Sequence, residues 1–363
     1  MFPAQASAFF TKNRGFVFAA LAAILFGAST PASKVLLPGS DPWLIAGLLY
    51  LGSGCGLFLL SAFFRFFGVE FSSDSKLTMR DLPWIFGATF FGGVCGPVFL
   101  MMGLAQTEAS TASLLLNIEG VLTALLAWFV FKENFDRRIA LGMIFILAGG
   151  VVLSWGGGFA LNSLAGPGLI FLACLCWAID NNFTRKISGK HPVQLVTLKS
   201  LVAGGTNVAL ALSLGAVWPQ LGTVLATATI GLLGYGLSLV CFVLALRHIG
   251  AARTGAYFSL APFVGSVLAV LFLRDSVTAN LGVAALFMAL GVWLHLTESH
   301  SHFHDHEELE HSHDHSHDEH HDHEHDGERA ANAEKRTHTH PHRHKKIGHA
   351  HAHFPDFHHQ HRH

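Results

Sequence analysis

The stretch "ASTASLLLNIEGVLTALLAWFVFKENFDRRIALGMIFILAGGVV", residues 109–152, has a second copy later in the chain. It aligns without a gap with "AARTGAYFSLAPFVGSVLAVLFLRDSVTANLGVAALFMALGVWL", residues 251–294. The constant shift that places Gly149 on Gly291 in this alignment is called the repeat offset. A repeat of this length predicts two halves built on the same plan.

The chain is too apolar for a soluble protein of its length. Of its 363 residues, 51% are hydrophobic and only 13% are charged, a composition typical of membrane proteins. A helix needs about 20 residues to cross a hydrocarbon core of ~30 Å. The apolar runs of that order predict ten membrane-spanning helices, over residues 15–36, 43–67, 82–105, 109–131, 138–155, 166–187, 192–215, 221–246, 251–273 and 277–297.

The predicted helices divide into two halves of five, residues 15–155 and 166–297. A looser alignment supports this division, because "LAAILFGASTPASKVLL" (21–37) lies over "LACLCWAIDNNFTRKIS" (172–188). Five is an odd number, so the halves cross the membrane in opposite senses, as the inverted repeats of secondary transporters do. The expected fold is an all-α integral membrane protein of two inverted five-helix repeats.

The distribution of Lys and Arg predicts the orientation. If the N-terminus is inside, thirteen basic residues of the loops and flanks fall on the inner side and two, Lys34 and Arg274, on the outer side. Cytoplasmic loops carry an excess of Lys and Arg. We therefore expect a multi-pass protein of the plasma (inner) membrane, with residues 1–14 and 298–363 in the cytoplasm.

These features resemble the drug/metabolite transporter superfamily, EamA type, over about residues 15–297. The resemblance rests on the two five-helix repeats, the acidic residue at a helix boundary and the Gly-rich last helix, as in "LTALLAWFVFKENFDRRIALGMIFILAGG" (122–150). Repeats of this family commonly carry proline where this chain has Glu119-Gly120, and the second repeat keeps it at Pro262. The resemblance implies a carrier of small organic metabolites, often an exporter.

Glu119 lies about halfway along a predicted helix, in "LLLNIEGVLTALL", two residues after Asn117. A charge at the bilayer centre costs at least ~2.5 kcal/mol, so it needs a partner, water or a function. Removal from water favours the protonated form of a carboxyl group, which would suit proton coupling. The alternative is a neutral or paired Glu119 that serves packing alone.

Two polar interruptions occupy matching places in the repeats. Asp180-Asn181 lies in the inner half of the sixth predicted helix, about 6 Å of helix rise from the depth of Glu119, and it aligns with Ser29-Thr30. Pro31 follows, and a proline removes a backbone hydrogen bond from its helix. Paired interruptions of this kind indicate a transporter's substrate site. Alternatively, Asp180 pairs with a basic residue at the inner interface, either Arg185 or Lys186.

Two tyrosines could contribute to such a site, whereas a nearby lysine has another explanation. Tyr235 and Tyr257 lie within predicted helices, where they offer hydroxyls to a ligand or belong to the core. Lys199 is close enough to the inner surface to extend its ammonium group into water, which we take as its role.

The last part of the chain, 298–363, has a different composition. It holds 23 of the 26 histidines and cannot bury enough apolar surface to order itself, so we expect disorder. Imidazole binds Zn, Ni and Cu(II). The expected metal ligands are His311, His313, His315, His317, His320, His321, His323 and His325; the alternative is a low-complexity segment that only solvates and titrates.

The most consistent interpretation is a secondary transporter that carries a small organic metabolite by alternating access. The family resemblance favours the export direction, and proton coupling is one option for its energy source. Its partners would be that molecule, the lipid bilayer and divalent metals at the tail. No required cofactor, nucleic-acid partner or enzymatic site is indicated. Two alternatives are a divalent transition-metal transporter fed by the tail and a non-transporting scaffold or metal sensor.

Overall fold

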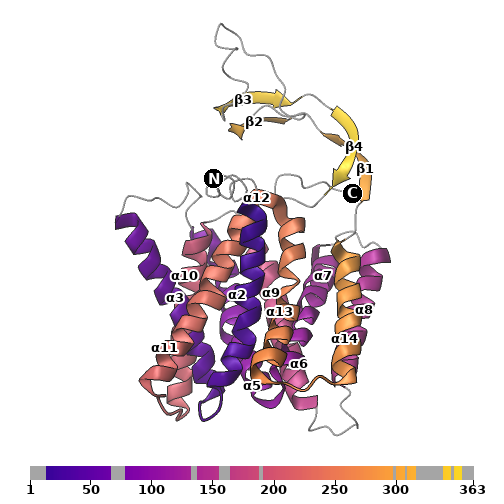
Figure 1. Ribbon diagram of the computed structural model, residues 1–363. Helices are drawn as coiled ribbons and strands as arrows, with labels where there is room; N and C mark the ends of the chain where they lie inside the picture. Colours follow the sequence, from indigo (N-terminus) through magenta and orange to yellow (C-terminus); the bar gives the residue numbers. More distant parts are fainter. Residues whose placement is uncertain are drawn as a thin grey trace, which may run out of the picture. The chain divides into compact units, whose positions relative to one another are not determined.

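The computed structural model of the chain (Figure 1) divides into a helical unit, Met1–Glu298, and a smaller unit, Ser299–His363. The residues that it describes are 14–66, 78–131, 137–154, 164–187 and 191–296 in the first unit, and 300–306, 309–315, 338–344 and 347–353 in the second.

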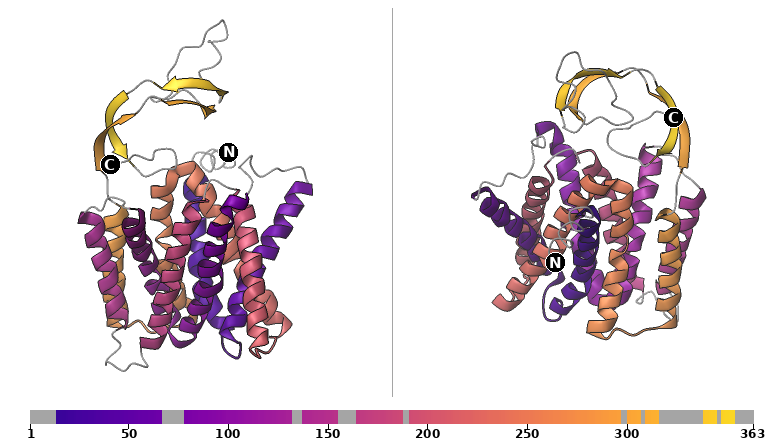
Figure 2. Two further views of the ribbon diagram at one scale, coloured as in Figure 1. Left: turned by 180° about the vertical axis from the view of Figure 1, so that it is seen from behind. Right: turned by 45° about the horizontal axis from the view of Figure 1, so that its top comes forward.

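Helices occupy the predicted spans of the first unit, as Figure 2 shows from two further sides. Six of them are long and apolar enough to cross a membrane, which supports a multi-pass membrane protein. The count of ten spans stays a prediction. In chain order the α-helices are α2 (Arg14–Leu36), α3 (Pro42–Phe66), α4 (Leu82–Ala88), α5 (Gly96–Gln106), α6 (Ala109–Leu115), α7 (Asn117–Phe131), α8 (Arg137–Ser154), α9 (Ala165–Arg185), α10 (Pro192–Ser213), α11 (Leu221–Ile230), α12 (Ser238–Phe258), α13 (Ala261–Leu268) and α14 (Ala279–Leu296).

Helix ends follow from local residue chemistry. α3 begins at Pro42, whose fixed φ and missing N–H suit a first helical position, and Asp41 Oδ1 accepts a hydrogen bond from Leu44 N at 3.0 Å. α10 ends shortly before Gly215, whose φ of 92° lies in the left-handed region that favours glycine. These signals place the loops at the ends of the bundle.

One predicted boundary is wrong. The apolar runs predicted a connection between residues 246 and 251, whereas α12 continues as helix to Phe258. The interruption lies instead at Ser259-Leu260, just before Pro262. Pro262 lacks the N–H that would bond Phe258 O and continue the helix, and the alanines of the predicted connection, Ala251 and Ala252, are strong helix formers.

The last helices of the two repeats pack against each other. α8 and α14 lie side by side in Figures 1 and 2. A Cβ on Gly149 would lie 3.0 Å from Ala284 O, and a Cβ on Gly291 would lie 2.5 Å from Gly142 O. The repeat offset relates Gly149 to Gly291 and Gly142 to Ala284, so the two helices approach through equivalent contacts. This symmetry agrees with the alignment of the two halves.

The two repeats also share an unusual backbone geometry. Two seven-residue π-helices, η2 (Thr89–Cys95) and η4 (Gly231–Leu237), begin at positions that the repeat offset places on each other. η2 joins α4 to α5, and η4 joins α11 to α12. A third, η5 (Ala269–Leu273), follows α13. Short π-helical segments are rare and frequently mark functional sites.

The smaller unit contains four strands, β1 (His300–His306), β2 (Leu309–His315), β3 (His338–His344) and β4 (Ile347–His353). β1 pairs with β4 and β2 with β3, both antiparallel. The prediction of disorder does not hold for these four segments. Their histidines alternate with other residues, a period of two that suits an extended strand.

Candidate functional site

A hydrogen-bonded cluster joins the two repeats around Glu119. Asn181 Nδ2, on α9, donates to Glu119 Oε1 at 2.9 Å and to Thr123 Oγ1 at 3.2 Å, both on α7. Glu119 and Thr123 are half-buried and Asn181 is exposed, so this carboxyl group is accessible within an apolar bundle. We call Glu119, Thr123 and Asn181 the Glu119 cluster.

A buried ion pair lies directly beside the Glu119 cluster. Asp180, next to Asn181 on α9, is ion-paired with Lys199 of α10, and Thr184 Oγ1 donates to its other carboxylate oxygen at 2.9 Å. The ammonium group of Lys199 therefore points into the protein. The prediction that it reaches the inner surface was wrong, because a buried carboxylate on the neighbouring helix offers a closer partner than water.

The π-helix η2 brings a backbone carbonyl to this pair. Gly92 O accepts hydrogen bonds from Tyr50 Oη at 2.8 Å and from Trp177 Nε1 at 3.0 Å. A Cβ on Gly92 would collide with the carboxylate of Asp180. Only glycine at this position allows η2 to approach the side chain of Asp180 so closely.

The equivalent contact recurs in the other half. Gly234, which the repeat offset places on Gly92, lies on η4, where a Cβ would lie 2.5 Å from the Cβ of Ser29. Ser29 aligns with Asp180, so each π-helix packs its glycine against the polar interruption of the opposite repeat. Ser29 Oγ donates to Phe26 O at 2.6 Å, and the next two residues, Thr30 and Pro31, are buried.

The remaining predicted site residues do not join the Glu119 cluster. Asn117 Nδ2 donates to Leu114 O at 3.0 Å and contacts the sulfur of Met288 at 3.8 Å, toward α14. The ring of Tyr235 packs 5.5 Å from that of Tyr50. Tyr257 packs against Phe16 near the start of α2, with ring centroids 5.6 Å apart. Tyr50 and Trp177, which bond Gly92 O beside Asp180, were missed because a buried aromatic ring in an apolar run carries no signal of its own.

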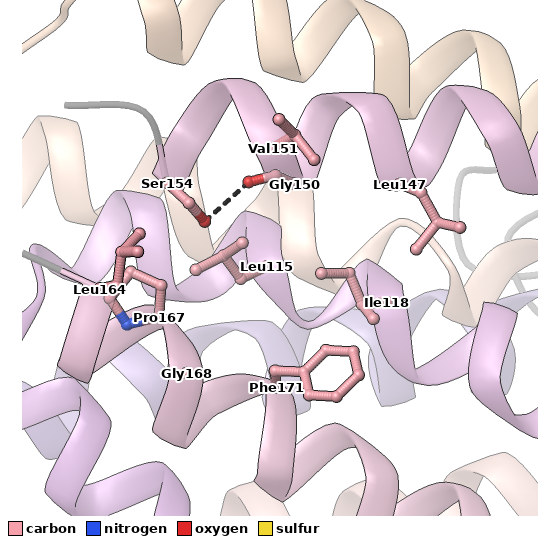
Figure 3. A pocket seen from close by; sticks show the side chains of 10 residues that line it. All are labelled: Leu115, Ile118, Leu147, Gly150, Val151, Ser154, Leu164, Pro167, Gly168 and Phe171. Atoms are coloured by element: carbon pink, nitrogen blue, oxygen red, sulfur yellow. Dashed lines mark hydrogen bonds between the residues drawn. The ribbon is translucent and has the colours of Figure 1, made fainter. Parts of the chain in front are cut away.

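An apolar cavity of about 600 Å³ lies between α8 and α9 (Figure 3). Ile118, the neighbour of Glu119, points into it together with Leu147 and Phe171. Its polar group, Ser154 Oγ, donates to Gly150 O at 2.8 Å. The cavity suits an aliphatic chain rather than a polar molecule.

Polar contacts connect the C-terminal end of α2, which we call the Lys34 end, to neighbouring helices. Lys34 Nζ donates to the carbonyl oxygens of Leu104 and Thr107, the latter at 2.9 Å, at the end of α5. Asp275 Oδ2, after η5, accepts from Ser110 N at 2.7 Å at the start of α6. The positive charge thus meets helix carbonyls and the negative charge a helix N-terminus, which stabilises both.

The proposed metal ligands of the tail are only partly visible. His311, His313 and His315 lie on β2, whereas His317, His320, His321, His323 and His325 lie outside the described residues. Among the residues that the structure describes, no three His, Cys, Asp or Glu side chains gather as a metal site.

The family model described as the EamA-like transporter family matches residues 13–155 and 164–297. The chain belongs to this family. The two matches coincide with the two repeats, so each half is one EamA-like unit, and the resemblance seen in the sequence is confirmed. Membership identifies a membrane transporter rather than an enzyme.

Curated relatives of this EamA-like protein are named as transporters. An uncharacterized transporter from Methanothermobacter thermautotrophicus is 26% identical over 307 residues, 80% of this chain and 88% of the relative. A Clostridium kluyveri transporter is 22% identical over 298 residues, 77% and 92% of the two chains. A probable 4-amino-4-deoxy-L-arabinose-phosphoundecaprenol flippase subunit, ArnE, from Pseudomonas fluorescens is 33% identical over 110 residues, 30% of this chain and 96% of ArnE.

One solved crystal structure shares the fold. It matches with a TM-score of 0.58 and 19% identity, over 79% of this chain and 99% of the other.

Proposed function

We propose that this EamA-like protein is a secondary transporter that exports a small organic metabolite from the cytoplasm, coupled to proton uptake at Glu119. The observation that supports it most is the Glu119 cluster. It combines a titratable carboxyl group, amide and hydroxyl partners from both repeats, and partial exposure within an apolar bundle. Intramembrane ionisable residues of this kind typically serve substrate or proton pathways.

The proposed transport mechanism is alternating access. The two repeats rock about the Glu119 cluster, which lies between them, and the glycines of η2 and η4 allow the close helix contacts across which they move. The Lys34 end is closed by the contacts of Lys34 and Asp275. On the positive-inside rule this end faces outward, so in this proposal these contacts must break before the substrate can leave the cell.

The proposed export function is tested by transport into inside-out vesicles that contain the full-length protein. Imposed acidification of the vesicle interior, which corresponds to the outside of the cell, should drive accumulation of the substrate there in exchange for protons. Pools of radiolabelled amino acids, nucleosides and other small metabolites serve as probes. If the accumulation of every pool were independent of the pH gradient, proton-coupled export would be contradicted.

A second substrate class is favoured by the apolar cavity beside Ile118 and by the flippase name of ArnE. This class is an amphiphile whose aliphatic chain occupies the cavity while its polar head meets the Glu119 cluster. The same vesicle assay distinguishes the two substrate classes. If the substrate is an amphiphile, an octyl ester of a metabolite should inhibit transport about tenfold better than the free metabolite. Burial of a few CH₂ groups is enough for that difference. Equal competition would favour the small polar substrate.

The histidine-rich segment is a cytoplasmic metal-binding appendage with a regulatory or buffering role in this proposal. β1–β4 belong to a unit separate from the helices, which favours an appendage.

Deletion of residues 300–363 should leave membrane insertion and the thermal midpoint of the helical unit nearly unchanged, because that unit contains the two EamA-like repeats. Zn²⁺ titration of the purified protein should show loss of high-capacity binding in the truncated form. Binding by the full chain should also weaken below a pH of about 6.5, since metals require neutral imidazole. A truncated protein that misfolds, or that binds as many ions, would place the segment within the transport machinery.

A further inference from the structure

Buried hydroxyl groups without a hydrogen-bond partner lie together at the Lys34 end. Among the side chains that the structure describes, these are the hydroxyl groups of Ser33, Thr107, Ser110 and Ser113. Ser33 precedes Lys34 on α2, the carbonyl oxygen of Thr107 accepts from Lys34 Nζ, and the backbone N–H of Ser110 donates to Asp275. The contacts that close this end therefore surround hydroxyl groups that have nothing to bond.

The helices pack too closely at this end for water to replace the missing partners. A Cβ on Gly265 of α13 would lie 2.7 Å from Ser113 Oγ, and a Cβ on Gly166 of α9 would collide with Thr107 Oγ1. A buried water needs space of its own and two to four polar partners. Because each hydroxyl group loses its hydration when it is buried, burial without a new bond opposes closure of this end.

The other half of the protein has no counterpart to the three serines. The repeat offset places Ser110 on Ala252 and Ser113 on Gly255, neither of which has a hydroxyl group. In the looser alignment Ser33 lies over Thr184, whose Oγ1 donates to Asp180 at 2.9 Å. The cost of the unpartnered serines therefore falls on one end of the molecule alone.

We propose that the hydroxyl groups of Ser33, Thr107, Ser110 and Ser113 form a conformational device that weakens the closed form of the Lys34 end. Opening of this end admits water, which bonds the hydroxyl groups, whereas closure leaves them unpaired. Their cost offsets part of the stabilisation that the contacts of Lys34 and Asp275 give to the closed form. The open and closed forms thus stay close enough in free energy to interconvert. This inference rests on the proposed alternating access and on the orientation that places the Lys34 end outside.

The first test is the thermal midpoint of the purified full-length protein. Ser113→Ala should raise the midpoint by on the order of 2–4 °C, because it removes a hydroxyl group that is costly only when buried. Ser110→Ala, which keeps the backbone N–H that bonds Asp275, should act in the same direction. The matched control is Ser238→Ala. Ser238 is as buried as Ser113, but its Oγ donates to Ala22 O at 3.0 Å, so its loss leaves a carbonyl unpaired and should lower the midpoint.

The second test measures opening of the Lys34 end directly. A cysteine introduced by Ser33→Cys is labelled with a membrane-impermeant maleimide added outside whole cells, and the modified peptide is identified by mass spectrometry so that the native cysteines do not contribute. Adding Ser113→Ala should slow this labelling about fivefold or more, since the closed form no longer carries the cost of that hydroxyl group. Adding Ser238→Ala should not slow it.

Two results would overturn the inference. If Ser113→Ala lowered the midpoint as much as Ser238→Ala, the Ser113 hydroxyl group would have a partner in the folded protein. If Ser113→Ala raised the midpoint but left the labelling rate unchanged, its hydroxyl group would affect folding and not opening. If the labelling slowed as expected while transport were independent of the pH gradient, the proposed proton coupling would fail and the conformational device would stand.

Discussion

Glu119→Gln should reach the membrane and lose pH-dependent transport. Glutamine keeps the size and the hydrogen-bonding oxygen that faces Asn181, but it cannot take up a proton. One proton coupled across one pH unit supplies about 1.4 kcal/mol, enough for at most about tenfold accumulation. In the variant we expect accumulation to fall to the level of simple equilibration, as measured with the substrate identified in inside-out vesicles.

Glu108→Gln is the matched control for this effect, because it makes the same substitution at an exposed carboxyl group away from the Glu119 cluster. It should leave the pH dependence intact. Asn181→Ala removes a partner of Glu119 without removing the titratable group, so it should shift the pH at which transport is half-maximal while transport remains coupled. Full activity and unchanged pH dependence in Glu119→Gln would remove the coupling role from this residue.

Lys199→Met should strongly destabilise the helical unit. It leaves Asp180 charged and buried against η2, and the loss of one partner of a buried ion pair costs about 3–5 kcal/mol. We expect a marked fall in the thermal midpoint of the purified protein. The double variant Asp180→Asn/Lys199→Met should recover most of that fall, because it leaves no uncompensated charge.

Arg80→Met provides the comparison for Lys199→Met, since Arg80 is exposed and loss of its charge should change the midpoint little. If the single variant Lys199→Met were as stable as wild type, the ion pair would contribute nothing and Lys199 would have another role. If the double variant were no more stable than the single one, the packing of the lysine chain rather than its charge would be the important factor.

The sequence predicted the large-scale plan because that plan follows from hydropathy and from the repeat. The position of Glu119 in an apolar run also indicated its depth. Its partner Asn181 was predicted to share the site because both interrupt apolar helices. Whether these residues line a substrate pathway stays a prediction that the vesicle experiments decide.

The sequence could not indicate which helices become neighbours. Lys199 seemed close enough to water to extend outward, and only the fold, which brings Lys199 to Asp180, reveals that carboxylate as its partner. Similarly, Tyr50 and Trp177 meet at Gly92 O. In the π-helical register of η2 the partner of this carbonyl would be residue 97, which is a proline and has no N–H. Such contacts depend on tertiary packing, which local patterns do not contain.

The matched π-helices η2 and η4 bear on the ancestry of this protein. A π-helical turn spans one residue more than an α-helical turn, so it is readily explained by insertion of a single residue into an older helix. The same geometry at equivalent positions of the two repeats is most simply explained by one insertion that preceded gene duplication. The ancestral polypeptide would then have been half as long, with one π-helix in its single repeat.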